Sequence, residues 1–284
     1  MPLPTFLIAG AQKSGTSWLA KRLQQHPEVF VPQREVHFFD RDERFALGEE
    51  AYASAYTAVA DELAIADKTP DYLWVRDRPD GPVVRDYPAR IHSVLPGAKV
   101  ILLLRNPVDR AVSALNHHLR ARSFSPLHSA DDLLVGARRA VAERYGVLSM
   151  GFYRTQIDAF LDHFDRSRLL VQFYEEAVVR DPAGGLREVC DFIGVDPDYP
   201  FDLLGEPVHK TYVSKAGLLL DYYVPALRPL ALRLNRRLPG DAKLRPSPAT
   251  EAALYDLYRP ENERLAELLG PLPPEWNGPA RPVS

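Results

Sequence analysis

The sequence is poor in cysteine. Cys190 is the only cysteine among 284 residues, so no disulfide can form within the chain and no multi-cysteine metal site can be built. It lies in the apolar-periodic stretch LREVCDFIGV. That pattern predicts a small buried side chain rather than a nucleophile.

Targeting and membrane segments are absent too. No run approaches the roughly 20 apolar residues that a helix needs to span a bilayer. The first residues, MPLPTFLIAGAQ, have no basic region followed by a long apolar one, as a secretory signal peptide would. We therefore expect a cytoplasmic protein with no membrane span.

An excess of one charge is also missing. Lysine and arginine total 35 and aspartate and glutamate 38, which gives a formal net charge of −3. This balance does not favour nucleic acid or a membrane surface as a partner, but it allows local basic sites for a small anion. Length and composition predict a single domain over residues 1–284, with the proline-rich residues 271–284 as a tail.

Short apolar runs alternate with helical patterns along the chain. The runs Phe6–Ala9, Val100–Leu104 and Leu169–Phe173 are continuous, which suits parallel strands buried on both faces. A weaker strand candidate, Leu63–Asp67, runs into Lys68. The helical patterns cover Ser17–His26, Tyr87–Leu95, Pro107–Leu119, Ala130–Tyr145, Gly151–Phe164, Pro182–Ile193 and Thr250–Leu269, the last with Pro260 expected to kink or split it. This alternation predicts an α/β fold, with a central parallel sheet flanked by helices in three layers.

The stretch FLIAGAQKSGTSWL, residues 6–19, predicts an anion site. It leads from a strand through a Gly-x-x-x-x-Gly loop into a helix, where backbone N–H groups and the helix dipole favour a phosphate. A Walker A loop would have lysine directly after Gly15, but Thr16 stands there and Lys13 comes three residues earlier. The Ser17 hydroxyl alone does not make a Mg²⁺ site. This P-loop-like stretch therefore suits a single 5′-phosphate that carries a transferable group.

Several segments in order resemble the sulfotransferases that use 3′-phosphoadenosine 5′-phosphosulfate (PAPS). The stretch AQKSGTSWL is similar to their 5′-phosphosulfate loop, and the motifs are most similar to those of heparan-sulfate-type carbohydrate sulfotransferases. The further matching segments are EVHFFD at 35–40, KTPDY at 68–72, VILLLRNPVDRAVS at 100–113, GFY at 151–153 with Ile157, and Leu254–Gly270 with Trp276. Together they cover nearly the whole chain, so they are far more specific than the loop alone.

The resemblance implies the transfer of a sulfuryl group from PAPS, the co-substrate, to a hydroxyl group. The acceptor is expected to be a carbohydrate or a small secondary metabolite. Glu35 matches the general base of the family, with His37 as the alternate base or as a group that orients the acceptor. Lys13 and Lys68 would stabilise the transferring group and the departing phosphate.

The same resemblance implies the residues that bind the donor. Arg105 and Ser113 would hold its 3′-phosphate, and the residues that would bind its 5′-phosphate are Lys13, Ser14, Gly15, Thr16, Ser17 and Trp18. Lys215 matches a basic residue in the family's loop over the 3′-phosphate and adenine. The run Ser214–Gly217 departs there from the family's Ser-Lys-Gly-Arg, because Ala216 replaces the glycine and no arginine follows.

Two other functions remain as alternatives. A nucleotide kinase or triphosphatase is disfavoured by Thr16 at the lysine position and by the absence of an acidic residue in Arg105-Asn106-Pro107 to help hold Mg²⁺. A non-catalytic nucleotide-binding module is disfavoured by the presence of Lys13, Glu35 and Lys68 together. We expect no metal, since no triphosphate charge has to be neutralised.

Overall fold

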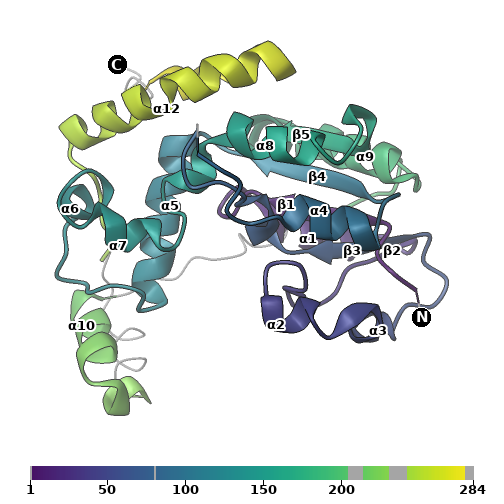
Figure 1. Ribbon diagram of the computed structural model, residues 1–284, viewed down its shortest axis with the longest axis horizontal. Coiled ribbons are helices and arrows are strands. Elements are labelled where there is room, and N and C mark those ends of the chain that lie inside the picture. Colours follow the sequence, from purple (N-terminus) through teal and green to yellow (C-terminus); the bar gives the residue numbers. More distant parts are fainter. Residues whose placement is uncertain (1, 80, 204–213, 230–241, 279–284) are drawn as a thin grey trace.

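The computed structural model describes residues 2–79, 81–203, 214–229 and 242–278. Within this part of the chain, five parallel strands form one sheet in the order β2-β3-β1-β4-β5 (Figure 1). The strands are β1 Phe6–Gly10, β2 Val29–Phe30, β3 Ala64–Lys68, β4 Lys99–Leu104 and β5 Leu169–Phe173. The parallel α/β fold is thus confirmed, including the weaker strand candidate that runs into Lys68.

Helices connect and cover the strands. Those between the strands and shortly after them are α1 Thr16–Leu23, α2 Asp42–Phe45, α3 Gly48–Ala53, α4 Tyr87–Val94, α5 Pro107–Arg120, α6 Ala130–Leu134, α7 Arg139–Glu143, α8 Tyr153–Leu161 and α9 Pro182–Ile193. Toward the C-terminus follow α10 Lys215–Tyr223 and α12 Pro248–Leu269. None of the helices in the described ranges is long and apolar enough to cross a membrane.

The central strand shows how the sequence builds three layers. Its five residues are fully buried and alternate between the two faces of the sheet. Phe6 and Ile8 pack in a cluster with α1 and α9, while Leu7 and Ala9 pack in another with α4 and α8. The sheet is therefore covered on both sides, as continuous apolar strands require. Cys190 is fully buried on α9, as the sequence predicted.

A third apolar cluster lies beyond the carboxyl ends of the strands, where α5, α6, α7 and α12 pack together (Figure 1). The prediction of a single helix over Ala130–Tyr145 is wrong, because the structure has two short helices there, α6 and α7. Gly136 lies between them, and glycine is a weak helix former. Arg138 bonds the carboxylate of Asp132 across this turn at 2.5 Å.

Pro260 does not split the last helix, which runs unbroken from Pro248 to Leu269. The fully buried side chains of Tyr258 and Leu265 anchor it on both sides of the proline. The prediction of a tail from residue 271 is also wrong for residues 271–278. Trp276 is 1% exposed, and its indole N–H donates to Glu175 at 3.1 Å. Residues 279–284 lie outside the described ranges.

Candidate active site

The loops that follow β1, β3 and β4 meet at the carboxyl edge of the sheet. The chain passes from β1 to β2 and β3 on one side and continues with β4 and β5 on the other, so the strand order reverses beside β1. Ligands of open parallel sheets bind in the crevice at such a point. Lys68 ends β3 and Arg105 follows β4, and both contact the β1–α1 segment. Lys68 donates to Ser17 at 3.3 Å, and Arg105 donates to the Lys13 carbonyl at 3.5 Å.

The loop after β1 has a left-handed backbone at two residues, Lys13 and Gly15. Gly15 has a φ of 95°, and a Cβ there would lie 2.8 Å from the ring of Tyr174, so no larger residue fits. Lys13 has a φ of 73°, which is uncommon for a residue other than glycine and is concentrated at functional sites. Helix α1 begins at Thr16, so the positive end of its dipole faces the loop.

The other residues predicted to bind the donor differ in exposure and in the element that carries them. Ser14 and Thr16 are buried, whereas Ser17 and Trp18 are partly exposed. Ser113 is partly exposed on α5, two turns after that helix begins.

The position of Arg105 is set by its neighbours on other elements. The Tyr153 hydroxyl donates to the Arg105 carbonyl at 2.8 Å. The next residue, Asn106, caps α5, because its side-chain oxygen accepts a hydrogen bond from the Val108 backbone amide at 3.0 Å. The backbone amide of Asn106 donates to the carboxylate of Glu175 at 2.8 Å. The guanidinium of Arg105 lies 5.0 Å from the centre of the Tyr174 ring. These bonds fix the start of α5, and with it the basic side chain at the sheet edge.

Positive charge gathers at this edge and is paired only in part: Arg105 lies 3.6 Å from the carboxylate of Asp109, and Lys68 pairs with Glu35. Burial, followed by the charges of Arg120 and Arg105, lowers the pKa of Lys13 to about 8. In the ranges that the structure describes, no carboxylate forms an ion pair with Lys13 or Arg120. Unpaired, partly buried cations are costly unless an anion binds among them, so this cluster has the character of a phosphate or sulfate site.

Arg120 was missed by the sequence reasoning because no motif includes it. It occupies the last turn of α5, seven residues after Ser113. Residues two turns apart lie on the same face of a helix, so the spacing itself was a usable signal.

Glu35 lies between two cationic groups. Its carboxylate pairs with the Lys68 ammonium through Oε1, and its Oε2 lies 3.2 Å from Nε2 of His37. The other ring nitrogen of His37 lies 2.8 Å from the carboxylate of Asp40. The structure thus brings together three of the predicted catalytic residues. Glu35 and His37 lie side by side, although His37 has a left-handed backbone (φ 53°).

These contacts set the protonation states of the cluster. Burial raises the pKa of the Glu35 carboxyl, but the hydrogen bond from His37 and the charge of Lys68 outweigh it and lower the pKa to about 2. The hydrogen bonds to Asp40 and Glu35 raise the pKa of His37 to about 10. His37 is therefore a charged donor to two carboxylates near neutral pH, and Glu35 is ionised.

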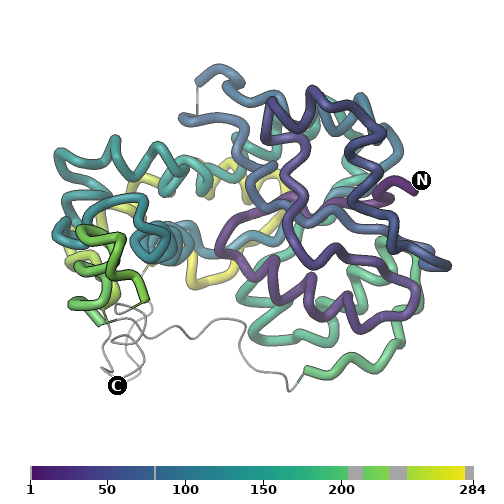
Figure 2. The backbone as a smooth tube through the Cα atoms, turned by 90° about the horizontal axis from the view of Figure 1, so that it is seen from below, coloured from purple at the N-terminus to yellow at the C-terminus, as the bar shows by residue number. Residues whose placement is uncertain are grey.

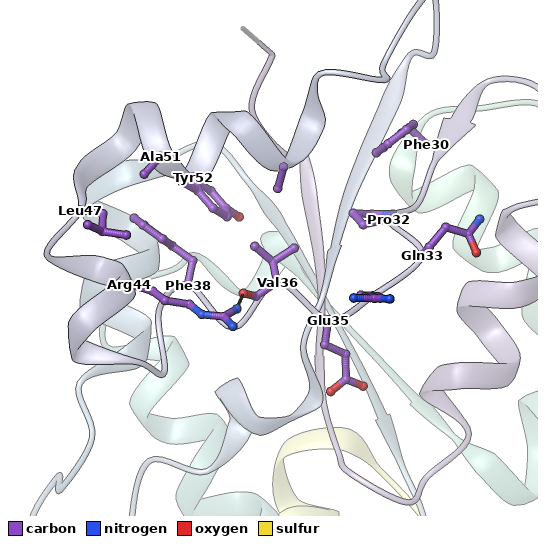
Figure 3. Close-up of a pocket in the computed structure, with 12 residues that line it drawn as sticks. Phe30, Pro32, Gln33, Glu35, Val36, Phe38, Arg44, Leu47, Ala51 and Tyr52 are labelled. Carbon is purple, nitrogen blue, oxygen red and sulfur yellow. Dashed lines mark hydrogen bonds between the residues drawn. The ribbon is translucent and has the colours of Figure 1, made fainter.

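A pocket of about 590 Å³ borders the same segment, between residues 30–38 and the helices α2 and α3 (Figure 3). Its wall is mostly apolar and includes Phe38, Leu47 and Tyr52. In Figure 3 the Glu35 carboxylate points away from these three side chains. The Glu35 carboxylate thus lies at the rim of the pocket, on the side where it pairs with Lys68 at the end of β3.

Buried polar side chains behind this segment were not singled out by the sequence. Asp67 is fully buried on β3, next to Lys68. Its carboxylate accepts hydrogen bonds from the hydroxyls of Tyr52, Thr69 and Tyr72 at 2.8, 2.8 and 2.9 Å. Thr69 and Tyr72 belong to the segment KTPDY, in which the sequence predicted a role only for Lys68.

Lys215 lies apart from the other predicted residues. It is the first residue of α10 and is exposed, at a hollow of about 460 Å³ that Leu119 and Lys243 also line. Figures 1 and 2 both show α10 beside the α5–α7 region and away from β1. Lys210, which precedes Lys215 by five residues and is a weaker match to the same loop of the family, lies outside the described residues.

One cluster has the composition of a possible metal site. His37, Asp40 and Asp71 each offer a ligand atom, and these atoms lie within 4.8 Å of one another. The Nδ1 atom of His37 is already in a hydrogen bond with Asp40.

Comparison with known proteins agrees with this geometry. The model of the sulfotransferase domain family matches residues 3–210. Human heparan sulfate glucosamine 3-O-sulfotransferase 6 is 30% identical over 280 residues, which cover 94% of this chain and 72% of that protein. Mouse heparan sulfate glucosamine 3-O-sulfotransferase 3A1 is 32% identical over 195 residues, which cover 68% of this chain and 46% of that protein. A sulfotransferase from Alicyclobacillus acidocaldarius has a similar crystal structure, with a TM-score of 0.69 and 26% identity, covering 97% of this chain and 99% of that one.

The chain belongs to the sulfotransferase family and is a sulfotransferase. The resemblance found in its motifs is thereby confirmed, as is the P-loop-like fold with a parallel sheet between helices.

The charge on His37 yields a test of the site's electrostatics. Because the folded-state pKa of about 10 lies above the ordinary 6.5, the charged ring stabilises the fold fully below pH 6.5 and less as the pH rises toward 10. The stability lost in His37→Gln, measured by urea unfolding, should be constant below pH 6.5 and shrink between pH 6.5 and 10. A loss that stays constant up to pH 10 would show that His37 has no such elevated pKa.

Proposed function

We propose that this protein transfers a sulfuryl group from PAPS to a hydroxyl group of a carbohydrate or secondary-metabolite acceptor. One observation carries the proposal: the Glu35 carboxylate contacts Lys68 at the same edge where Lys13, Arg105 and Arg120 gather. A base for the acceptor hydroxyl and positive charge for the donor are thus adjacent, as in-line transfer requires.

The donor would lie across the carboxyl edge. Lys13, the loop amides and the N-terminus of α1 would hold the 5′-phosphosulfate, and Arg105 with Ser113 would hold the 3′-phosphate. The positions of Arg105 after β4 and of Ser113 on α5 support this, since both lie beyond the strand next to β1. Arg120 would add charge near Lys13. With these cations present, we propose a reaction without a metal.

Donor binding would also activate the base. In the free protein Lys68 and His37 hold the Glu35 pKa at about 2, which makes the carboxylate a weak proton acceptor. A bound sulfuryl group competes for the Lys68 ammonium. Once Lys68 turns toward that group, Glu35 loses a cationic partner and its pKa rises. The base would thus become effective only when the donor is in place.

The chemical step then balances as follows. The acceptor oxygen forms a bond to sulfur while its proton passes to Glu35. The bond between sulfur and the bridging oxygen breaks, and Lys13 and Lys68 neutralise the charge that develops on the departing 3′,5′-bisphosphoadenosine (PAP). His37 stays protonated and orients Glu35, so we assign the base to Glu35 rather than to His37.

A sugar hydroxyl is the preferred acceptor. The two relatives are named as heparan sulfate glucosamine 3-O-sulfotransferases, which supports a sugar hydroxyl as the acceptor here. A hydroxyl of a secondary metabolite is the second candidate, on the strength of the mostly apolar pocket that borders Glu35.

Donor recognition can be tested through Arg105. PAP should raise the melting temperature of the wild type more than Mg·ATP does. Arg105→Ala should weaken PAP binding by roughly 10- to 100-fold, since it removes charge-assisted bonds to phosphate. Affinity for adenosine 5′-phosphosulfate, which lacks the 3′-phosphate, should change little. Isothermal titration calorimetry measures both.

Arg187→Ala is the matched control for this test, because Arg187 is exposed on α9 and pairs only with Asp198 among the described residues. It should bind PAP like the wild type. Stabilisation by Mg·ATP and not by PAP would contradict the proposed donor.

The base assignment can be tested with Glu35→Gln. This variant should bind PAP nearly as well as the wild type but lose about 10²-fold or more in kcat, because the amide cannot take the acceptor's proton. Glu43→Gln, on the exposed helix α2, serves as control and should keep normal turnover. Wild-type turnover in Glu35→Gln would move the base to another residue.

A further inference from the structure

The segment that carries Glu35 and His37 rests on buried hydroxyl groups. The His37 amide donates to the Thr69 hydroxyl at 3.3 Å. The amides of Phe38 and Phe39 donate to the Tyr72 hydroxyl at 3.0 and 3.4 Å. Three consecutive backbone N–H groups, starting at His37 itself, are thus bound by two side chains from the segment after β3.

The direction of these bonds depends on Asp67. A backbone N–H can only donate, so each hydroxyl must accept from the segment and send its own single proton elsewhere. Both protons go to the Asp67 carboxylate, from Thr69 to Oδ1 and from Tyr72 to Oδ2. An ionised carboxylate only accepts, so it fixes both hydroxyls in the orientation that the segment needs.

These hydrogen bonds are isolated from water, so each partner is needed. Asp67, Thr69 and Tyr72 are each 0% exposed, so no solvent molecule can replace a missing partner. The backbone they hold is also unusual, because His37 has a left-handed conformation that side chains rarely adopt. Such a conformation persists where surrounding bonds hold it.

We propose that Asp67 is a positioning residue: through Thr69 and Tyr72 it clamps the backbone of residues 37–39 and so keeps Glu35 and His37 in reactive geometry. The inference deepens the proposed function and rests on it for its effect on turnover. Asp67 itself does not touch the reactants.

The charge state of Asp67 agrees with this role. Burial raises its pKa to about 6, against the lowering effect of the hydrogen bonds from Thr69, Tyr52 and Tyr72. The other titratable groups that act on it are Asp40, on the segment it holds, and Tyr56. The carboxylate is therefore ionised above pH 6, where the clamp is complete.

Tyr52 provides a matched control. Its hydroxyl donates to the same Asp67 oxygen as that of Tyr72 and is equally buried, but it binds no amide of residues 37–39. Tyr52→Phe and Tyr72→Phe each remove one bond to Asp67. Only Tyr72→Phe also removes the acceptor for the Phe38 and Phe39 amides.

Amide hydrogen exchange of residues 36–40, in the full chain, tests the clamp directly. Tyr72→Phe and Thr69→Val should speed exchange there by roughly tenfold, as expected when such a bond is lost. Thr69→Ser, which keeps the hydroxyl, should restore slow exchange, and Tyr52→Phe should leave it slow. Equal acceleration in Tyr52→Phe and Tyr72→Phe, or none in either, would overturn the proposal.

Turnover gives the second readout. Asp67→Asn, Thr69→Val and Tyr72→Phe should lower kcat by about tenfold or more while KM for PAPS stays near the wild-type value, because the base is misplaced and the donor site is intact. Thr69→Ser, which keeps the hydroxyl, should retain kcat. A rise in KM with unchanged kcat would contradict positioning. If the wild type transfers no sulfuryl group at all, the proposed function fails, and hydrogen exchange still decides whether the clamp exists.

Discussion

The contact between Lys68 and Glu35 is the interaction on which the site depends. It joins a cation suited to the donor with a carboxylate suited to the acceptor, across two loops that are far apart in the sequence. The Lys68 side chain is 13% exposed and that of Glu35 is 35% exposed, so each charge is partly desolvated and is stabilised by the other. A bound donor offers Lys68 another anion. In the function proposed here, the pair would therefore couple donor binding to the basicity of Glu35.

The fold supplies both halves of this contact from the same sheet. Lys68 ends β3, and the chain leading from β2 returns Glu35 to the edge where β3 ends. The hydroxyls that hold residues 37–39 come from the turn just after Lys68. The carboxylate that orients those hydroxyls is the neighbour of Lys68 on the strand. A short piece of β3 and the turn after it thus place the Lys68 cation and bind the backbone of residues 37–39, which follows Glu35 closely in the chain.

The sequence predicted the parts that depend on local patterns. The apolar runs became β1, β3, β4 and β5, and the helix predicted over Pro182–Ile193 has these limits in the structure. The helices α2 and α3 were not predicted, because residues 42–53 are mostly exposed and show no apolar period. In the site, Glu35, His37 and Lys68 came from motifs and spacing. Arg120 and Asp67 did not, since their roles arise from burial and from partners distant in the chain, which one sequence does not display.

The most direct test of the account is sulfuryl transfer itself. Wild-type protein is incubated with radiolabelled PAPS and a chelator of divalent metals, together with glucosamine oligosaccharides and, separately, phenolic and alcoholic metabolites. We predict label on an acceptor hydroxyl and an equal amount of PAP, with neither diminished by the chelator. Absence of transfer to every acceptor class, with Mg²⁺-dependent hydrolysis or transfer of ATP phosphate instead, would contradict it.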